Sequence, residues 1–273
     1  MPEGPGQYQY PRTERVHWGR GALALLPREV DRVGAHKALI ITGNTLANKT
    51  GQIKRIAGLL GDRYAGVFHH THAHPTKELV LEVAAAIRET GADLLISVGG
   101  SSMSDIAKAA NLAYTERLTS VEDFDTYRNR YSHGQGRQRV RLMANNPLPL
   151  IVVPTLLSAG DFTPSAGIVD SVTHTKQIFV DPRLVCRVAI LDPEATLDSP
   201  MDLWLSTGVK ALDHALEAIC SIRHSPITDA PSEKAISMLF SALPRSRKDP
   251  RDLDARLECL MAAWIAIQGS YTP

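Results

Sequence analysis

LLISVGGSSMSDIAK, residues 94–108, is the stretch that decides the fold of this chain. It begins with an apolar run typical of a buried strand, Gly99 and Gly100 break the run, and the helix-forming sequence SDIAK follows at once. A strand that turns through glycines into a helix leaves the N–H groups of the helix N-terminus free, with a partial positive charge. Because glycine also lets a phosphate approach the backbone, the stretch predicts an anion-binding corner.

Two features of the corner bear on how specific this prediction is. Ser102 and Asp105 have the spacing of a capping box, in which the hydroxyl and the carboxylate satisfy each other's N–H groups. The corner lacks the GxGxxG spacing of an ordinary dinucleotide fold and the GKS or GKT ending of a P-loop. From these residues alone, a plain strand-to-helix turn with a glycine corner therefore stays open as the alternative.

The chain before the corner alternates between strands and helices. Strands are predicted by apolar runs at residues 38–42, 64–68 and 94–98, and the segments between them have helical spacing. Continuous apolar strands that alternate with helices are typical of a parallel sheet covered on both faces. Ligands of such sheets bind beyond the carboxyl ends of the strands, which is where Gly43, Asn44 and the glycine corner lie.

The chain after the corner changes character at Pro200. Before it, apolar runs predict strands at 150–153 and 188–191 and a hairpin at 168–180. After it, only helical patterns remain, at residues 203–222, 229–243 and 253–268. The last helix is strongly apolar, so it either packs on the first domain or belongs to a larger helical domain of which part is missing.

We therefore predict a Rossmann-like α/β fold followed by an all-α part that is incomplete. The predicted divisions are a flexible tail at residues 1–12, a dinucleotide-binding α/β domain at 13–195 and a partial helical catalytic domain at 196–273.

Composition excludes several classes of partner. The 273 residues carry 30 Lys and Arg against 29 Asp and Glu, so no strong field points to nucleic acid or to an anionic membrane. The 3 cysteines are widely spaced without a CxxC pair, which indicates reduced thiols. The N-terminus has no signal pattern and no apolar run reaches membrane-spanning length. We expect a soluble, cytoplasmic protein that binds neither nucleic acid nor membrane.

Several stretches taken together resemble the iron-containing (group III) alcohol dehydrogenase family, which has the dehydroquinate-synthase-like fold. They are SVGGSSMSDIAK (97–108), VPTLLSAGDFTPSAGIVD (153–170), Lys176, DPRLVCRVAILDP (181–193) and STGVKALDHALEA (206–218). They are collinear with the family from about residue 16 to residue 268, and the chain is similar in particular to the branch that includes maleylacetate reductases. The resemblance implies an N-terminal domain that binds NAD or NADP and an all-helical C-terminal domain that bears the catalytic centre.

The resemblance also assigns cofactor contacts by position in the family motifs. They fall on Thr42, Asn44, Gly99, Gly100, Ser101, Ser102, Asp105, Thr155, Ser158, Asp161 and Lys176. The loop 99–102 matches the one that cradles the pyrophosphate, with Ser101 where a third glycine is usual, and Lys176 matches a lysine near the nicotinamide ribose. The sequence departs from the family at Leu156, where a second threonine is usual, and at Asp161, where the family has glutamate. No acid that would select NAD stands at residues 42–44, so NAD and NADP both stay open.

The helix after Pro200 decides whether a metal takes part. In metal-dependent members of the family, an aspartate and a histidine four residues apart on this helix bind the ion, with two further histidines downstream. The corresponding pair here is Lys210 and His214, and a protonated lysine has no lone pair and repels a divalent cation. Asp213 points about 100° away around the helix, and no histidine follows His224. We therefore expect no bound iron or zinc.

Without a metal, a cationic side chain would have to polarise the substrate carbonyl. Our hypothesis is that Lys210 or His214 does so, since residues four apart share one face of a helix. The alternative is that His214 is a hydrogen-bonded helix histidine and Lys210 a surface charge.

The resemblance implies an NAD(P)-dependent oxidoreductase that transfers hydride between the nicotinamide and an alcohol, aldehyde or keto-acid substrate, and it implies a homodimer. A catalytically impaired, cofactor-binding fragment of such an enzyme is the alternative. A lyase related to dehydroquinate synthase is a third possibility, which Lys210 and the PTLLSAGD motif disfavour.

Overall fold

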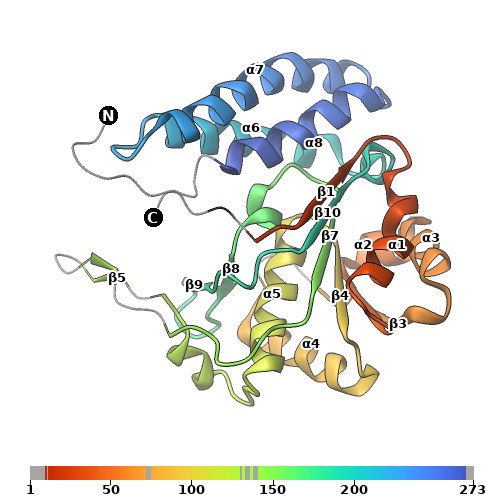
Figure 1. Cartoon of the computed structure of the whole chain (residues 1–273), viewed down its shortest axis with the longest axis vertical. Coiled ribbons are helices and arrows are strands. Elements are labelled where there is room, and N and C mark those ends of the chain that lie inside the picture. The colour runs from red at the N-terminus through yellow and green to blue at the C-terminus, as the bar shows by residue number, and fades with distance from the viewer. Residues whose placement is uncertain are drawn as a thin grey trace.

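The computed structural model describes residue 10 and residues 12–71, 75–129, 131, 132, 136, 137 and 141–268. Almost all of the predicted tail at 1–12 lies outside these residues. Within them the chain forms a six-stranded parallel sheet with helices on both faces and a layer of three helices at one end (Figure 1).

The main sheet consists of six strands, and the apolar runs named above predicted five of them closely. The six strands are β1 (Arg15–Trp18), β2 (Ala38–Thr42), β3 (Tyr64–Phe68), β4 (Leu94–Gly99), β7 (Leu150–Pro154) and β10 (Val188–Leu191). The spatial order is β1-β10-β7-β4-β2-β3, and every neighbouring pair is parallel. The connections reverse direction between β2 and β4, and such a switch point is where open parallel sheets bind ligands at the carboxyl ends of their strands.

Helices cover both faces of the sheet, as Figure 1 shows. They are α1 (Leu26–Arg32), α2 (Asn44–Lys49) and α3 (Gln52–Leu60) on one side, and α4 (Lys77–Thr90) and α5 (Ser101–Thr115) on the other. Alternate residues of the strands point to the two faces, so Ile40 and Ile96 pack toward α1 and α3 while Leu39 and Leu95 pack toward α4 and α5. The α/β prediction is confirmed.

Two hairpins stand apart from the main sheet. The predicted one is confirmed as the antiparallel pair β8 (Ser165–Val169) and β9 (Lys176–Val180). The other joins two short strands, β5 (Tyr131–Ser132) and β6 (Gly136–Arg137), within the loop that follows α5.

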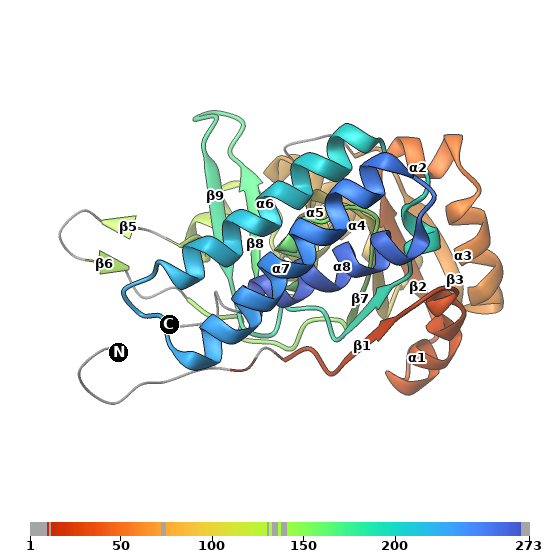
Figure 2. The ribbon, with the colours of Figure 1, turned by 90° about the horizontal axis from the view of Figure 1, so that it is seen from above.

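The C-terminal part is a layer of the helices α6 (Met201–Ile219), α7 (Pro226–Lys248) and α8 (Leu253–Gln268), which lie side by side in Figure 2. Cys259, Leu260 and Ile267 of α8 belong to the same buried cluster as the strands and α5, so the last helix packs on the α/β part. Arg256 of α8 also joins this helix to α6 and to the segment before it, because Arg256 is buried against the ring of Trp204 and donates to the carbonyl of Thr196 at 2.9 Å. One core thus runs through both parts, and the domain boundary at 195 stays a prediction.

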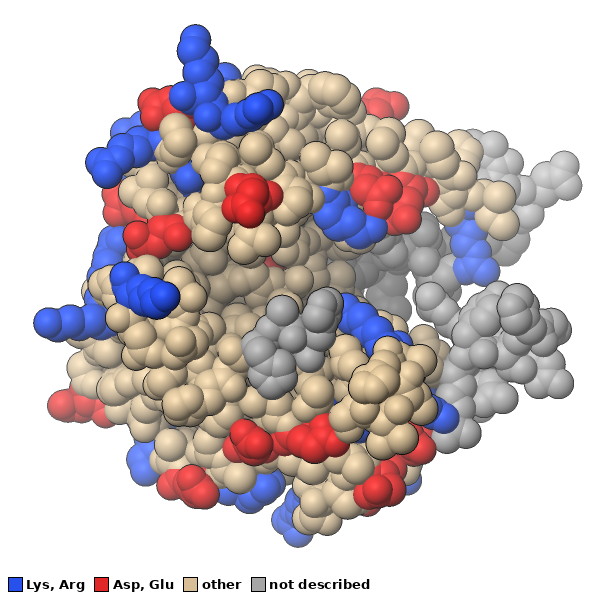
Figure 3. Space-filling model, turned by 180° about the vertical axis from the view of Figure 1, so that it is seen from behind, with Lys and Arg blue, Asp and Glu red and all other residues tan. Residues whose placement is uncertain are grey.

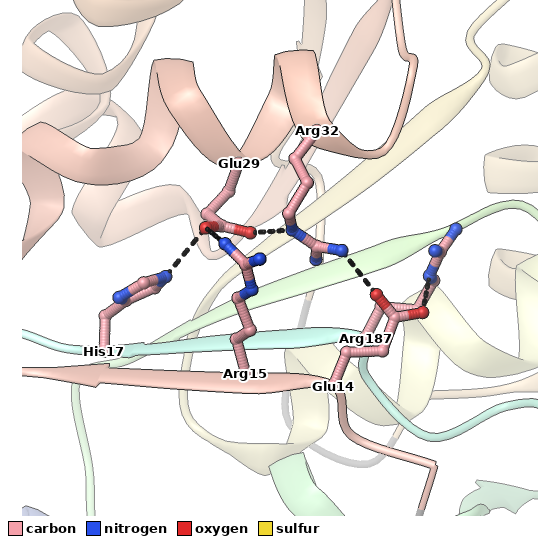
Figure 4. A network of polar contacts seen from close by, with 6 residues as sticks. All are labelled: Glu14, Arg15, His17, Glu29, Arg32 and Arg187. Carbon is pink, nitrogen blue, oxygen red and sulfur yellow. Dashed lines mark hydrogen bonds and ion pairs between the residues drawn. The ribbon is translucent and has the colours of Figure 1, made fainter.

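The edge strand β1 is tied down by a buried carboxylate. Glu29 of α1 has no exposed side-chain surface and accepts from Arg15, His17 and Arg32 at 3.2, 2.9 and 2.5 Å (Figure 4). Arg32 also pairs with Glu14 at 2.6 Å, just before the strand begins. Burial by itself raises the pKa of Glu29, but the hydrogen bonds from Arg32 and His17 outweigh burial and lower it.

No helix among the described residues is long and apolar enough to cross a membrane.

Candidate functional site

The glycine corner joins β4 to α5 at the switch point of the sheet. Gly99 has a φ of 144°, which a side chain would strain, and a Cβ there would lie 2.7 Å from Cγ of Met103. Gly100 is the N-cap of α5, and no side chain caps the helix. The first N–H groups of α5 therefore keep the partial positive charge that favours an anion.

The predicted capping box between Ser102 and Asp105 is wrong. The helix begins at Ser101, so Ser102 lies inside its first turn and not before it. Asp105 is nine-tenths buried and turns inward, where its Oδ2 lies 3.8 Å from Nζ of Lys176 on β9. An inward carboxylate does not reach back to the N-cap, and the N-cap residue Gly100 has no side chain, so the corner stays uncapped.

A second corner lies directly beside the first. Gly99 pairs with Pro154 at the end of β7, and the N–H of Thr155 donates to the Gly99 carbonyl at 2.9 Å. Leu156, which stands where the family has a threonine, packs on Gly100, since a Cβ at 100 would lie 2.9 Å from its Cδ1. The glycine-serine and proline-threonine corners thus share one edge of the sheet, and a leucine side chain lies between them.

Helix α6 is anchored on this second corner. The hydroxyl of Thr207 accepts from the N–H of Leu157 at 3.1 Å, and Ser199 just before the helix donates to the Thr155 carbonyl at 2.6 Å. The helical layer therefore sits over the carboxyl edge of the sheet. Figure 3 shows a hollow in the surface of the molecule between the helical layer, which is above, and the α/β part, which is below.

Beneath the corner lies a buried polar chain that starts in the sheet. Ser97 of β4 and Ser104 of α5 are 3.1 Å apart, and Ser104 donates to Oδ1 of Asp161 in the 3-10 helix Ala159–Phe162. Lys108 has no exposed surface and donates to the carbonyls of Gly160 at 2.5 Å and of Ser165 at 3.2 Å. Oδ2 of Asp161 is buried and has no partner among the described residues.

Burial shifts the pKa values of these charged groups. It raises the pKa of Asp161 to about 7, although Ser104 and Lys108 act against it. It also raises the pKa of Asp105, against the nearby charges of Lys108 and Lys176, and it lowers the pKa of Lys108. The interior of the site thus holds one lysine amino group and two carboxyl groups, and the pKa of Asp161 lies near neutral pH.

The other residues assigned by resemblance lie at the same edge with different exposure. Thr42 is buried and donates to the carbonyl of Val98 at 2.9 Å, so its hydroxyl is used within the sheet. Asn44 is exposed at the start of α2 and accepts from Asn48. Thr155 is buried, while Ser158 is half-buried before the 3-10 helix. The corner therefore brings together backbone N–H groups more than side-chain hydroxyls.

Lys210 and His214 lie on α6, one and two turns beyond Thr207. Their polar atoms have different partners: Lys210 pairs with Asp213, and Nδ1 of His214 lies 3.5 Å from Glu217. The hydrogen bond to Asp213 raises the pKa of Lys210, so this side chain is an ammonium at neutral pH. His214 shares the face of Thr207, which is the face that meets the second corner.

This donor set does not fit a divalent ion. The ammonium of Lys210 offers no lone pair to a metal ion, and its ion pair with Asp213 also occupies the carboxylate of that residue. Among the described residues, no group of three or more His, Cys, Asp and Glu side chains could hold a metal.

Sequence reasoning missed the buried residues of the site. Ser97 interrupts an otherwise apolar strand, and Lys108 stands on an otherwise apolar stretch of α5. These interruptions were the available signal, because a polar residue in a buried run needs partners. Their partners, the carbonyls of residues 160 and 165, could not be read from the sequence.

Comparison with known proteins accords with this geometry. The sequence model for iron-containing alcohol dehydrogenase matches residues 13–193, and the C-terminal model of the Fe-containing alcohol dehydrogenase family matches residues 204–270. The chain belongs to the iron-containing alcohol dehydrogenase family.

Similar members of this family include reductases and dehydrogenases. Maleylacetate reductase of Burkholderia cepacia is 30% identical over 254 residues, which are 93% of this chain and 62% of that protein. The NAD-dependent methanol dehydrogenase of Bacillus methanolicus is 29% identical over 91% of this chain and 62% of its own length. The sulfoacetaldehyde reductase of Bifidobacterium kashiwanohense, solved with NAD+, superposes with a TM-score of 0.85 at 25% identity, over 96% of this chain and 66% of that one. The chain spans about three fifths of the length of the curated relatives that it matches.

Proposed function

We propose that the protein is a nicotinamide-dinucleotide-dependent oxidoreductase that acts on an alcohol/carbonyl pair. The observation that carries the proposal is the uncapped start of α5 behind Gly99 and Gly100, at the switch point of a parallel sheet. The relatives named for reductase and dehydrogenase activity support the same reaction class.

The residues of the two corners fit a dinucleotide. The free N–H groups of Ser101 and Ser102 would bind the pyrophosphate, and a glycine at 100 keeps that approach open. Lys176, with more than half of its side chain exposed, supplies a positive charge beside the corner. Either NAD or NADP, when bound, supplies or accepts the hydride. Residues 42–44 include no acidic side chain that would repel the 2′-phosphate of NADP, so the sequence is compatible with both NAD and NADP.

We propose further that the reaction runs without a metal at the α6 pair. The positive charge of Lys210, or a proton held by His214, would stabilise the negative charge that develops on the substrate oxygen. The pair offers a cation where a metal site needs a second lone-pair donor.

The experiment combines binding, turnover and metal content. NADH fluorescence measures cofactor binding, and nicotinamide absorbance measures turnover with a panel of aldehydes and keto acids. Lys210→Ala and His214→Ala should each lose turnover and keep NADH binding, while Lys234→Ala, at an exposed lysine of α7, should change neither.

Each contrary result removes one part of the proposal. A wild-type chain that does not bind NADH overturns the function, and one that binds it without turnover is the impaired, cofactor-binding alternative. Full turnover in both α6 variants removes their role. One tightly bound iron or zinc per chain in elemental analysis refutes the metal-free reaction.

We also propose a homodimer in the cytoplasm. Three free cysteines in the described residues accord with a reducing compartment. Light scattering that gives the mass of a single chain would contradict the dimer.

A further inference from the structure

A pocket of about 350 Å³ lies at the amino edge of the sheet, opposite the edge that bears the glycine corner. Three adjacent strands, β1, β10 and β7, begin at this edge, and the segments that lead into them line the pocket. This amino-edge pocket is formed by side chains from residues 12–14, 146–148 and 183–187. Because β7 is 5 residues long, about 15 Å of strand separates the pocket from the corners described above.

The amino-edge pocket carries a surplus of positive charge. Its lining holds the guanidinium groups of Arg12, Arg183 and Arg187 against one carboxylate, that of Glu14. One oxygen of Glu14 accepts from Arg187 and the other from Arg32, both at 2.6 Å, as Figure 4 shows. The charge of Glu14 is thus already compensated, and it leaves the positive charge of Arg12 unopposed.

Two of the three arginines keep donor groups free. Arg12 is exposed and has no hydrogen bond or ion pair with another residue that the structure describes. Arg187 uses its Nε for Glu14, so its Nη1 and Nη2 have no partner in the described part of the chain. Its backbone is fixed on both sides, because its N–H donates to the carbonyl of Leu150 at 2.8 Å and its carbonyl accepts from the N–H of Glu14 at 2.9 Å. The end of a guanidinium held in this way presents two N–H groups that match the two oxygens of a carboxylate.

The rest of the lining is rigid and partly apolar. Arg183 donates to the two oxygens of Asp181 at 2.9 and 2.8 Å, so its charge is compensated and its side chain is held in place. Pro147, Leu148 and Val185 add apolar surface to the pocket. Small-molecule sites typically combine an apolar lining with a few polar groups that fix the orientation of the ligand. The amino-edge pocket has both, with Arg12 and Arg187 as the free polar groups.

We propose that the amino-edge pocket is a binding site for a small organic carboxylate, separate from the site of the proposed reaction. The carboxylate pairs with Nη1 and Nη2 of Arg187 and with the guanidinium of Arg12. The carbon skeleton of the ligand packs on the apolar side chains of residues 147, 148 and 185. A free phosphate ion has no apolar part for this wall and fits less well. The inference does not rest on the proposed function, because no residue of the pocket takes part in it.

The test is calorimetric titration of the protein with benzoate, a planar carboxylate that carries an apolar ring. Benzoate should bind at least about fivefold more tightly than acetate, which lacks the ring, and than inorganic phosphate. Saturating NADH should leave the benzoate affinity unchanged, because the glycine corner lies at the other edge of the sheet. Equal affinities for the three anions, or benzoate binding that NADH abolishes, overturn the proposal. If NADH itself fails to bind, the proposed function fails, and the titration without NADH still decides the inference.

Arginine variants place the bound benzoate. Arg12→Gln and Arg187→Gln should each weaken its binding at least about fivefold, since each removes a charged donor. Arg187→Lys keeps the charge but loses the two parallel N–H groups, so it should weaken binding as well. The matched control Arg223→Gln removes an exposed arginine between α6 and α7 and should leave the affinity unchanged. Arg12→Gln breaks no contact within the described residues, so it tests the pocket even if Arg187→Gln disturbs the fold. Wild-type affinity in both glutamine variants overturns the proposal.

Discussion

Replacing Asp161 by Asn should make the protein more stable at neutral and alkaline pH. Asp161 is fully buried, its Oδ1 accepts from Ser104, and its Oδ2 has no partner among the described residues. An asparagine keeps the acceptor for Ser104 and removes the charge. The substitution therefore isolates the cost of ionising this carboxyl inside the protein.

The magnitude follows from the pKa of Asp161, which burial raises from 3.8 to about 7. A group that holds its proton more tightly in the folded state contributes stability at low pH and loses it as the pH rises through the folded pKa. The rise of about three pH units corresponds to about 4 kcal/mol in all, of which about 2 to 3 kcal/mol is lost between about pH 5 and pH 8. The wild type should lose this free energy of unfolding and Asp161→Asn should not.

The assay is urea unfolding of both proteins at a series of pH values, with the difference in free energy plotted against pH. Shifted groups that do not interact with Asp161, Glu29 among them, occur in both proteins and cancel in that difference. A difference that is constant to within about 0.5 kcal/mol across the range would refute the reasoning, because ionising Asp161 would then carry no folding cost.

Three further substitutions test other parts of the structure. Gly100→Ala should weaken NADH binding at least about tenfold in a fluorescence titration, because it places a methyl group where the pyrophosphate and Leu156 approach. The control Gly58→Ala, in open space on α3, should keep the NADH affinity and add about 0.5 kcal/mol to the free energy of unfolding. Glu29→Gln should cost about 2 kcal/mol in urea unfolding at pH 7, and this difference should shrink as the pH falls toward the lowered pKa of Glu29. Arg256→Met should lower the free energy of unfolding by about 2 kcal/mol and leave an unchanged m-value, since it removes buried hydrogen bonds between α8 and Thr196 in the segment that leads into α6.

The local pattern predicted the strands of the sheet well. Strands were predicted at residues 38–42 and 64–68, which are the bounds of β2 and β3, because a short apolar run between polar turns is compatible with few other secondary structures. The alternation of strands and helices then limited the fold to a doubly covered parallel sheet, and the family resemblance pointed to the same edge for the site.

The side-chain partners within the site could not be predicted in the same way. Ser102 and Asp105 fit a capping box by spacing, but the spacing does not reveal that Asp105 turns inward toward Lys176. Lys108 would be read as a helix-surface residue by composition, and only the fold brings the carbonyls of residues 160 and 165 to its ammonium. These contacts join segments more than 50 residues apart, whereas capping rules describe neighbours within one turn.

The anchoring of α6 explains why the corner and the pair Lys210 and His214 should be considered together. The hydroxyl of Thr207 accepts a hydrogen bond from the N–H of Leu157. A Cβ on Gly208 would lie 3.0 Å from Cδ1 of the same leucine, so the backbone of α6 packs closely against the proline-threonine corner. A helix held this closely at one turn can neither rotate nor slide without breaking the contact, so the face two turns further on is fixed as well. His214 lies on that face, about 10 Å along the axis from Thr207 at the usual helical rise. If Lys210 and His214 act on a ligand at the glycine corner, as we propose, their orientation depends on the second corner, although that corner contributes neither of the two side chains.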